Sequence, residues 1–158
     1  NNLFNDFEYN NIINNLIICY ILLGDFLTTF ESIEEAREFF NGDKFAAKLG
    51  IQLDELGEDY CICSVEIKED FRNGFGAVMG GAIFTLGDFA FAVMSNQLHN
   101  LTVGLQVSIN YLSGAKGEKL IAKATVRKDG RTTSVINVDI TDDTGREIAQ
   151  FVGTGYKM

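Results

Sequence analysis

One segment constrains the fold of this chain more than any other, because residues 82–97 are apolar on nearly every side of a helix. A helix without a polar face must be buried all round, so the chain has to supply a layer that covers it. The sole acid or base between Arg72 and His99 is Asp88. The segment therefore predicts a long central helix that carries one carboxylate.

The covering layer is predicted by segments in which apolar and polar residues alternate. In one of them Cys61, Cys63 and Val65 share a face of a strand. The dipeptide Asp129-Gly130 is typical of a tight turn between antiparallel strands. Strands with one apolar face need a partner layer, so the sequence predicts an α+β fold with five to six antiparallel strands curved around the helix. The predicted strands cover residues 51–56, 60–68, 103–111, 120–126, 136–140 and 148–156.

A membrane-spanning helix is the alternative for the apolar segment, because residues 77–94 are long enough to cross a bilayer. Three glycines and Asp88 near the middle of that run argue against this alternative. The formal net charge of −9 also lacks the cationic character that binds anionic membranes or nucleic acids. We therefore expect neither a membrane nor a nucleic acid as a partner.

The first thirty residues differ from the rest of the chain. Residues 12–23 form an apolar run, but no Lys or Arg precedes it and no small-residue cleavage site follows it. We treat residues 1–30 as an N-terminal extension without an assigned role, and residues 31–158 as one domain. Within the domain, Ser32 and Glu35 form a capping box for a helix to about Phe40. A second short helix is expected between Asp43 and Gly50.

No metal site and no cofactor are predicted. The three cysteines, Cys19, Cys61 and Cys63, have neither the number nor the spacing of a disulfide framework, and His99 is the only histidine. Cys61 and Cys63 are expected to be small core residues. Free cysteines are typical of a reducing compartment, so we expect a cytoplasmic protein.

Asp88 is the strongest candidate for a reactive group. A lone carboxylate on an apolar helix is costly unless it has a partner. Desolvation raises its pKa and its basicity, which suits a general base or a nucleophile. The structural alternative is an Asp that hydrogen-bonds to a neighbouring chain across an interface.

A glycine-rich stretch, Asn73–Gly81, precedes the helix. Glycines allow a ligand to approach the backbone closely, and free N–H groups at a helix N-terminus attract negative charge. Such a site suits the oxyanion that forms when a thioester is attacked. Glycine pairs are also common in ordinary turns, so the signal lies in the combination with Asp88 about two turns later.

The residues from Asn73 to Asp88 resemble the motif N-x-x-G-x-x-H-G-G, followed by an Asp on the helix, of the hotdog-fold acyl-CoA thioesterases. The branch that they resemble most is the phenylacetate-pathway, or PaaI-type, thioesterases. The resemblance covers about residues 32–156, and it implies a hotdog fold and a homodimer or homotetramer whose active sites combine two chains. Further agreement lies at residues 109–112, 115–117, 130–131, 143–145 and 148–149.

The resemblance also implies roles for single residues. Asp88 matches the catalytic carboxylate, Gly80 the glycine whose N–H polarises the thioester carbonyl, and Asn73 the asparagine that positions substrate or water. Residues expected to contact the substrate nearby are Met79, Gly81 and Gly104. Two of these depart from the family pattern, because Met79 stands in place of a histidine and Gly104 in place of a Ser or Thr. The lost histidine is expected to weaken hydrolysis.

A cationic stretch adds an argument that is independent of the family. Six of the thirteen basic residues lie between Lys116 and Arg131. Such a stretch on an acidic protein suits a phosphorylated ligand such as coenzyme A. The expected contacts are Lys128, Gly130, Arg131 and Thr132. The alternative is a solvated strand whose lysines prevent edge-to-edge aggregation.

The expected function is therefore hydrolysis of acyl-CoA thioesters. A non-catalytic acyl-CoA-binding or regulatory module is the main alternative, and Met79 is the residue that favours it. Hydroxyacyl dehydration is a further enzyme class on this fold. That chemistry uses a histidine together with a carboxylate, and His99 lies beyond the helix, so the sequence favours it less.

Overall fold

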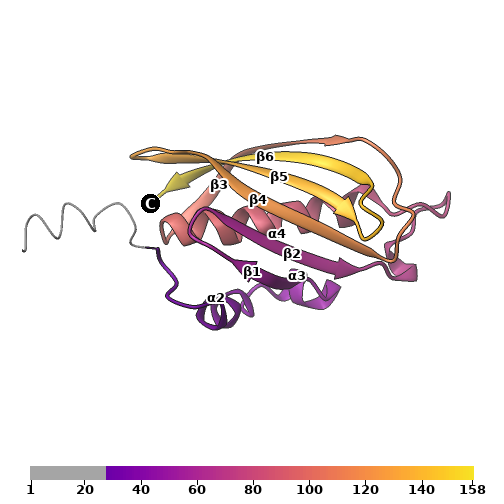
Figure 1. Ribbon diagram of the computed structural model, residues 1–158, viewed down its shortest axis with the longest axis horizontal. Coiled ribbons are helices and arrows are strands. Elements are labelled where there is room, and N and C mark those ends of the chain that lie inside the picture. The colour runs from indigo at the N-terminus through magenta and orange to yellow at the C-terminus, as the bar shows by residue number, and fades with distance from the viewer. Residues whose placement is uncertain (1–27) are drawn as a thin grey trace, which may run out of the picture.

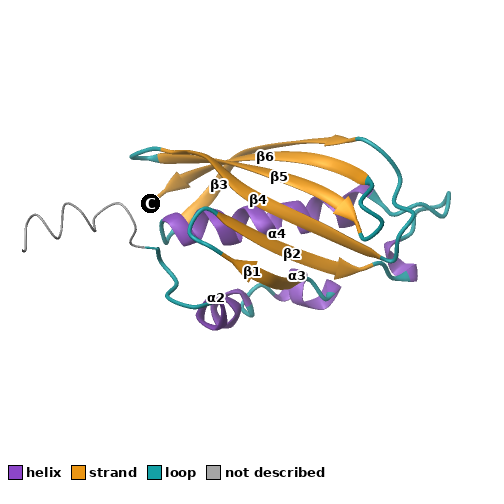
Figure 2. Ribbon diagram, in the orientation of Figure 1, coloured by secondary structure: helices purple, strands orange, loops and turns teal. Residues whose placement is uncertain are grey.

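The computed structural model describes residues 28–158, which form one curved antiparallel sheet with a long helix, α4 (Gly80–Leu98), lying in its concave face (Figure 1). Figure 2 shows the two layers, with the strands of the sheet above and beside α4 and two short helices below it. This arrangement confirms the predicted α+β hotdog fold.

Six strands make up the sheet, in the order β1-β2-β4-β5-β6-β3. Every neighbouring pair is antiparallel, so β1 and β3 are the two edge strands. The short helices α2 and α3 and a 3₁₀ turn, η1, lie before α4 in the chain. The bounds are β1 Gln52–Leu56, β2 Tyr60–Glu66, β3 Thr102–Tyr111, β4 Lys119–Asp129, β5 Thr133–Asp142, β6 Glu147–Lys157, α2 Ile33–Phe40, α3 Lys44–Leu49 and η1 Glu69–Phe71.

Both short helices begin at the predicted caps. The Ser32 hydroxyl accepts a hydrogen bond from the Glu35 N–H at 3.2 Å, and the Glu35 carboxylate accepts one from Glu31 N–H rather than from Ser32. In α3, the Asp43 carboxylate accepts from the N–H of Ala46 at 3.3 Å. The helix ends at Gly50, whose φ of +86° is a left-handed conformation that favours glycine.

The core forms where α4 approaches the sheet closely. Gly87 makes this approach possible, because a Cβ at that position would lie 3.0 Å from the Phe151 ring of β6 and 3.2 Å from Ile140 of β5. The Phe91 ring fills the space that a side chain at Gly153 would need. Cys61 and Cys63 are fully buried in the same core, as predicted from their alternation.

The prediction that α4 is buried all round is wrong for the single chain. Gly81 and Asp88 are exposed, and Phe84, Thr85 and Ala92 are only half-buried. The sheet curves around one side of the helix, so these residues form an uncovered stripe along the other side. Apolar periodicity predicts that such a stripe is covered, but it does not say by which chain.

Edge strand β3 is also largely uncovered. The predicted alternation, with Val103 on the same face as Ile109, is wrong: Val103 pairs with Tyr156 and Ile109 with Phe151, which lie on opposite faces of β6. Val103, Leu105 and Tyr111 are exposed, with Leu105 at 63%. A β-bulge interrupts its pairing with β6 between Gly104 and Gln106. The strand has no Lys, Arg, Asp or Glu from Thr102 to Tyr111, so its free edge lacks the charges that usually block pairing with another chain.

A buried carboxylate fixes the connection that follows β3. Asp142 is 1% exposed, and it accepts hydrogen bonds from the backbone N–H groups of Lys116, Gly117 and Arg146. Its closest contact is the Thr144 hydroxyl, at 2.6 Å. Because these donors stabilise the charged form, led by Thr144, the pKa of Asp142 lies well below its ordinary value.

The first described residues of the chain lie beside the C-terminal end of α4. Phe30 is buried against Phe39 and Phe40, and its N–H donates to the Gln97 side chain at 3.0 Å. Residues 1–27 of the predicted N-terminal extension, including Cys19, lie outside the described residues. Between residues 28 and 158, no helix combines the length and hydropathy that crossing a bilayer requires.

The contact between Phe91 and Gly153 leads to a first prediction. In Gly153→Ala the new Cβ would lie 2.5 Å from the Phe91 ring, which is buried and cannot move away freely. We expect the free energy of unfolding to fall by ~1–3 kcal/mol, the usual cost of overpacking a core. The measurement is urea denaturation. Gly114→Ala is the matched control, since nothing lies within 4 Å of its Cβ position. Equal midpoints for both variants would contradict the predicted fit.

Candidate functional site

Asn73 organises the loop that leads into α4. Its side-chain oxygen accepts hydrogen bonds from the N–H groups of Phe75 at 2.9 Å and Ala77 at 3.2 Å. The Arg72 guanidinium donates to the carbonyl of Gly76, whose φ is +76°. The amide oxygen of Asn73 is therefore committed to the turn, which leaves the amide nitrogen as the part that can face a ligand.

The first turn of α4 offers two free N–H groups. Met79 is the N-cap residue, and its side chain makes no capping hydrogen bond. Ala82 N–H donates to the Met79 carbonyl at 3.0 Å, whereas the N–H groups of Gly80 and Gly81 have no acceptor among the described residues. Together with the helix dipole, these two donors suit a developing negative charge on oxygen.

The backbone at this point is held by Tyr111 at the end of β3. Its hydroxyl donates to the Gly80 carbonyl at 3.0 Å, and a Cβ at Gly80 would lie 3.1 Å from its ring. The Gly80 carbonyl and the Gly81 N–H belong to the same peptide plane. Tyr111 therefore fixes the direction of the Gly81 N–H, and polarisation through the peptide strengthens that donor.

Met79 covers the outer side of the same turn. Its side chain is 51% exposed, and its terminal methyl group would lie 2.5 Å from a Cβ at Gly81. The thioether thus lies over the glycine pair, in the position where the family motif has a histidine. It contributes an apolar surface where a histidine would contribute a hydrogen bond.

Asp88 lies on the uncovered stripe of α4. The residue is exposed in the single chain, yet partial burial of its carboxyl group raises the pKa of Asp88, and the Asp43 carboxylate raises it further. The predicted direction of the pKa is confirmed, but full burial is not. A carboxylate with a raised pKa is a stronger base and is suited to taking a proton from water.

Asp88 and the free N–H groups are far apart within one chain. Asp88 follows Gly80 by eight residues of helix, which corresponds to about 12 Å along the axis. A carbonyl bound by Gly80 and attacked from Asp88 needs both groups within roughly 3 Å of the reacting atoms. One chain therefore cannot bring both groups to the same carbonyl carbon.

The remaining predicted residues lie at the opposite end of α4. Gly104 pairs with Gly155, and the carbonyl of Thr132 in the β4–β5 hairpin accepts from Lys157 N–H at 2.9 Å. Tyr111, which touches Gly80, is seven residues further along β3, or about 23 Å of extended strand. Figure 1 shows the hairpin and the loop before α4 at opposite ends of the molecule.

The structure thus sorts the predicted residues into two groups with Asp88 between them. Asn73, Met79, Gly80 and Gly81 meet at the N-terminal end of α4. The second group lies at the C-terminal end and consists of Gly104, Lys128, Gly130, Arg131 and Thr132.

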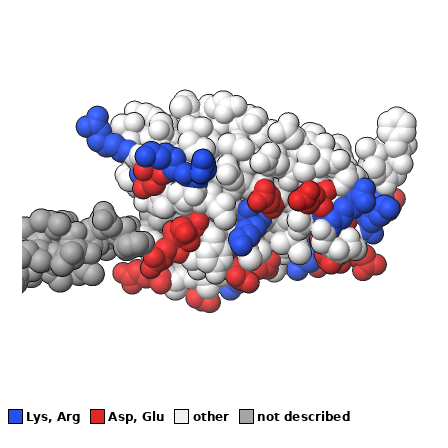
Figure 3. All heavy atoms as spheres, turned by 45° about the horizontal axis from the view of Figure 1, so that its top comes forward, with Lys and Arg blue, Asp and Glu red and all other residues white. Residues whose placement is uncertain are grey.

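The hairpin presents a positive surface. Lys128, Arg131 and Thr132 are exposed, and Gly130 allows the tight turn because its Cβ would meet the Thr133 carbonyl at 2.9 Å. Asp129 is paired with Lys157 at 2.6 Å, which neutralises the one acidic side chain in the turn. In Figure 3 blue Lys and Arg atoms lie at the end of the molecule that carries this hairpin, next to a red acidic group, and another blue group lies at the opposite end.

A cavity of about 420 Å³ opens beside the first turn of α4. It lies among α3, η1, the start of α4 and the end of β3, and the free N–H turn forms part of its rim. The lining includes Phe45, Leu49, Phe71, Met79, Phe84 and Tyr111. Met79 and Gly81 were predicted at the site, and the sequence left Phe84 open as either a core residue or a wall of an apolar pocket; none of the other lining residues was predicted there.

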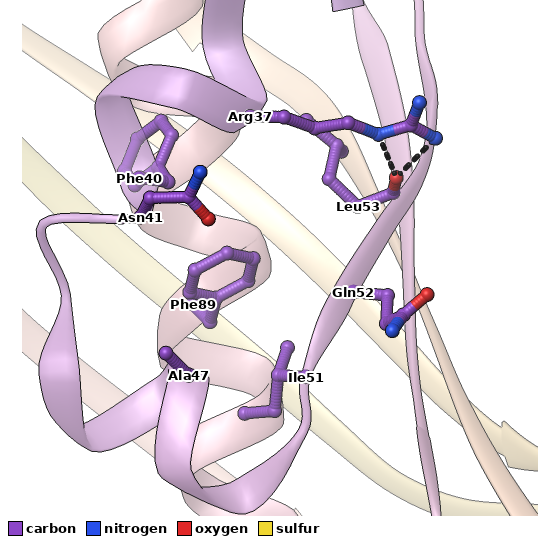
Figure 4. A pocket seen from close by; sticks show the side chains of 8 residues that line it. All are labelled: Arg37, Phe40, Asn41, Ala47, Ile51, Gln52, Leu53 and Phe89. Carbon is purple, nitrogen blue, oxygen red and sulfur yellow. Dashed lines mark hydrogen bonds between the residues drawn. The ribbon is translucent and has the colours of Figure 1, made fainter. Parts of the chain in front are cut away.

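A second cavity, of about 310 Å³, lies on the other side of α3 between α2 and β1 (Figure 4). Phe40 and Phe89 form its apolar floor. The Arg37 guanidinium donates to the Leu53 carbonyl through Nε at 2.9 Å and Nη2 at 2.8 Å. The Arg37 guanidinium therefore covers part of the free edge of β1. None of the predicted catalytic or substrate-binding residues lines this cavity.

Sequence reasoning missed Tyr111 and Phe45 as members of the site. Tyr111 was assigned to a strand and to a stretch that agrees with the family, but to no role at the site, and Phe45 was assigned to a short helix. Each is brought to the site by tertiary packing, so no local pattern identifies them. Among the described residues, no group of three His, Cys, Asp or Glu side chains is placed to hold a metal ion.

Comparison with known proteins bears on this arrangement. Residues 75–149 match the family model of the thioesterase superfamily. A proposed esterase of Archaeoglobus fulgidus is 30% identical over 130 residues, which cover 81% of this chain and 84% of that protein. The acyl-coenzyme A thioesterase PaaI of Escherichia coli is 28% identical over 126 residues, which cover 79% of this chain and 90% of that protein.

Solved structures agree with the fold as a whole. The E. coli PaaI structure superimposes with a TM-score of 0.75 at 26% identity, covering 79% of this chain and 91% of that one. A hypothetical thioesterase of Streptococcus pneumoniae TIGR4, solved with coenzyme A, superimposes with a TM-score of 0.71 at 29% identity. The second match covers 77% of this chain and 95% of the other.

Proposed function

Because this chain belongs to the thioesterase superfamily, we propose that it hydrolyses acyl-CoA thioesters to a free acid and coenzyme A. Its likeness to E. coli PaaI, in sequence and in fold, supports the PaaI-type branch. The observation that carries the proposal is the pair of free N–H groups at Gly80 and Gly81, on the same helix as a carboxylate of raised pKa.

The proposed reaction divides the work between these groups. The thioester carbonyl oxygen accepts from the N–H groups of Gly80 and Gly81, which stabilise the oxyanion as the carbonyl carbon is attacked. The Asp88 carboxylate takes a proton from the attacking water, or attacks the carbon itself to give an anhydride that water then hydrolyses to the free acid. Collapse of the tetrahedral intermediate breaks the C–S bond, and the thiolate of coenzyme A leaves and is protonated. Asn73 is proposed to orient the substrate or the water through its amide nitrogen.

The site is proposed to be completed by a second copy of the chain. The 12 Å between Gly80 and Asp88 supports this, since the two groups then act on one thioester only from different chains. The uncovered edge of β3 and the exposed stripe on α4 are surfaces that a two-fold partner would cover. Antiparallel pairing of two β3 strands sets their helices in opposite directions. We propose a homodimer as the unit of activity, and a homotetramer as a dimer of dimers.

The same geometry assigns the positive hairpin a role. In an antiparallel pair, the C-terminal end of one α4 lies near the N-terminal end of its partner. The hairpin residues Lys128, Gly130, Arg131 and Thr132 are then proposed to contact the coenzyme A phosphates, with Gly104 near the thioester. Exposed cations around a tight turn suit a phosphate group.

A non-catalytic acyl-CoA-binding module is the second candidate, and Met79 is the observation that favours it. Its thioether lies over the glycine pair and adds no hydrogen bond to the site. The free N–H groups and Asp88 do not depend on it, which favours hydrolysis. We also propose a cytoplasmic location, supported by the buried free thiols of Cys61 and Cys63.

The role of Asp88 is tested by Asp88→Asn, which keeps the shape but removes the base and the nucleophile. We expect kcat to fall by at least about a hundredfold while KM changes little. In the parent, kcat/KM should fall on the acid side at a higher pH than an ordinary carboxyl would give, because the pKa of Asp88 is raised. Thiol release from a series of acyl-CoAs measures both effects. An unchanged rate makes Asp88 structural, and binding without thiol release by the parent supports the second candidate.

The shared site is tested by mixing two inactive variants. Gly80→Leu blocks the oxyanion donors and collides with Tyr111, and Asp88→Asn removes the base. When the two are refolded together, we expect about a quarter of the parent activity, because half of the random dimers are mixed and each holds one intact site of two. Each variant refolded with itself is the control. A mixture that assembles, by light scattering, but stays inactive argues for a site within one chain.

The hairpin is tested by charge reversal at Arg131. We expect Arg131→Glu to raise KM for acyl-CoA about tenfold with kcat nearly unchanged, because phosphate contacts are made equally in the ground and transition states. Lys123→Glu is the matched control, since it makes the same charge change on β4, where Lys123 lies 5.9 Å from the Tyr60 ring. Equal KM values for both variants would remove the hairpin from the site.

A further inference from the structure

We propose that the 420 Å³ cavity beside α4 binds the acyl group of the substrate, and that it selects an uncharged apolar acyl group small enough to end inside it. This inference rests on the proposed function and deepens it, because the family alone leaves the acyl group open. We name the cavity the acyl pocket and define its walls by Phe45, Leu49, Phe71, Phe84 and Tyr111.

The position of the acyl pocket follows from the residues that it shares with the free N–H turn. Met79 and Gly81 belong to both. Tyr111 also belongs to both, because its ring lines the pocket while its hydroxyl holds the Gly80 carbonyl. A thioester whose oxygen is bound at Gly80 and Gly81 therefore has the mouth of the pocket beside its carbonyl carbon.

The chemistry of the walls indicates what the pocket accepts. Phe71 and Ala82 are buried, and Leu49 and Phe84 are half-buried, so a deep apolar surface faces the cavity. The Thr85 hydroxyl is occupied, because it donates to the Gly81 carbonyl at 2.8 Å. An apolar acyl group gains free energy by leaving water here, in proportion to the area that it buries.

Charge at the pocket excludes another class of substrate. Asp70 lines the cavity, and no Lys or Arg is among its lining residues. The Lys68 ammonium is engaged elsewhere, because it donates to the Leu49 carbonyl at 2.8 Å and lies 5.9 Å from the Phe71 ring centroid. An acyl group that ends in a carboxylate would meet Asp70 without a cation to offset the repulsion.

The size of the pocket limits the length of the acyl group. A volume of about 420 Å³ lies near the lower end of the ~300–1,000 Å³ found for small-molecule sites. It holds an acyl group but not coenzyme A as well, which agrees with the proposed placement of the phosphates outside the pocket, at the hairpin of the partner chain. A longer chain would extend past the walls, where it buries no further apolar area in this pocket.

Phe45 is the residue that sets this limit. It projects from α3 with 64% of its surface exposed, although it forms one wall of the pocket. The helix that carries it has six residues and is held by Asp43 and Gly50 at its ends. Removing the ring should open the pocket toward solvent without removing a core contact.

The test compares acyl-CoAs from butanoyl to hexadecanoyl, phenylacetyl-CoA and adipoyl-CoA. We expect the parent to favour the uncharged substrates of intermediate size and to reject adipoyl-CoA. Phe45→Ala should raise the kcat/KM ratio of hexadecanoyl to octanoyl about tenfold, the scale of about one methylene group in an apolar pocket. Phe39→Ala is the control for loss of an exposed ring, because Phe39 on α2 does not line the pocket, although its ring also packs against Phe30.

A second variant tests the charge argument independently of size. Asp70→Lys should raise kcat/KM for adipoyl-CoA relative to hexanoyl-CoA at least about tenfold, since it replaces a repulsive group with an ion-pair partner. A parent that prefers adipoyl-CoA overturns the inference. The inference is also overturned if Phe45→Ala leaves the chain-length profile unchanged. The same holds if Asp70→Lys leaves the kcat/KM ratio of adipoyl-CoA to hexanoyl-CoA unchanged.

Binding separates failure of the pocket from failure of the proposed function. The probe is S-octyl-CoA, a thioether that cannot be hydrolysed, measured by calorimetry. If the parent releases no thiol but binds S-octyl-CoA, and Phe45→Ala changes its Kd at least about tenfold while Phe39→Ala does not, the pocket stands and hydrolysis is refuted. If hydrolysis occurs but Phe45→Ala changes neither the profile nor the Kd, the pocket is refuted alone. Absence of both binding and thiol release overturns both.

Discussion

One-sided coverage of α4 is the constraint on which the rest of this structure depends. The sheet approaches the helix closely enough for Gly87 to meet Phe151 and for Phe91 to occupy the space above Gly153. This fit leaves no room for a second layer on that side, and the opposite stripe of α4 stays open. The stripe carries Asp88, and its N-terminal end carries the free N–H groups. The proposed chemistry of the protein is therefore located where its core is incomplete.

The same constraint explains why the site is divided. A helix of 19 residues places its two ends about 28 Å apart, and the strands that cover it place their hairpins at those ends. The oxyanion donors are fixed at one end by Tyr111, and the positive hairpin at the other end is fixed by the Asp129–Lys157 ion pair. The Asp88 carboxylate lies between these two ends of the helix and faces outward. In the proposed dimer, two such chains in opposite directions supply complementary halves.

Sequence reasoning predicted the parts of the fold that depend on neighbouring residues. The caps at Ser32 and Asp43, the turn at Asp129-Gly130 and the alternation of Cys61 with Cys63 are all local signals, and each corresponds to an observed element. The stretch from Asn73 to Gly81 was predicted as a site because its glycines and the helix that follows are contiguous in the chain.

What the sequence did not reveal depends on contacts between distant segments. The hydrogen bond from Tyr111 to Gly80 joins residues 31 positions apart, and Phe45 reaches the acyl pocket only because α3 packs beside α4. The expected full burial of Asp88 was wrong for a related reason. Apolar periodicity reports how much surface needs cover, whereas the source of that cover, the same chain or another, is a property of the assembled sheet.

The two edges of the sheet differ in a way that matters during synthesis of the protein. Edge strand β1 carries Asp54 and Glu55, and Arg37 occupies its Leu53 carbonyl, so foreign strands are kept away. Edge strand β3 has no charged side chain and exposes Leu105. A newly made chain thus carries a template for misassociation until that edge is occupied. Its tendency to aggregate should be governed by how quickly it meets another copy, and so by its concentration in the cell.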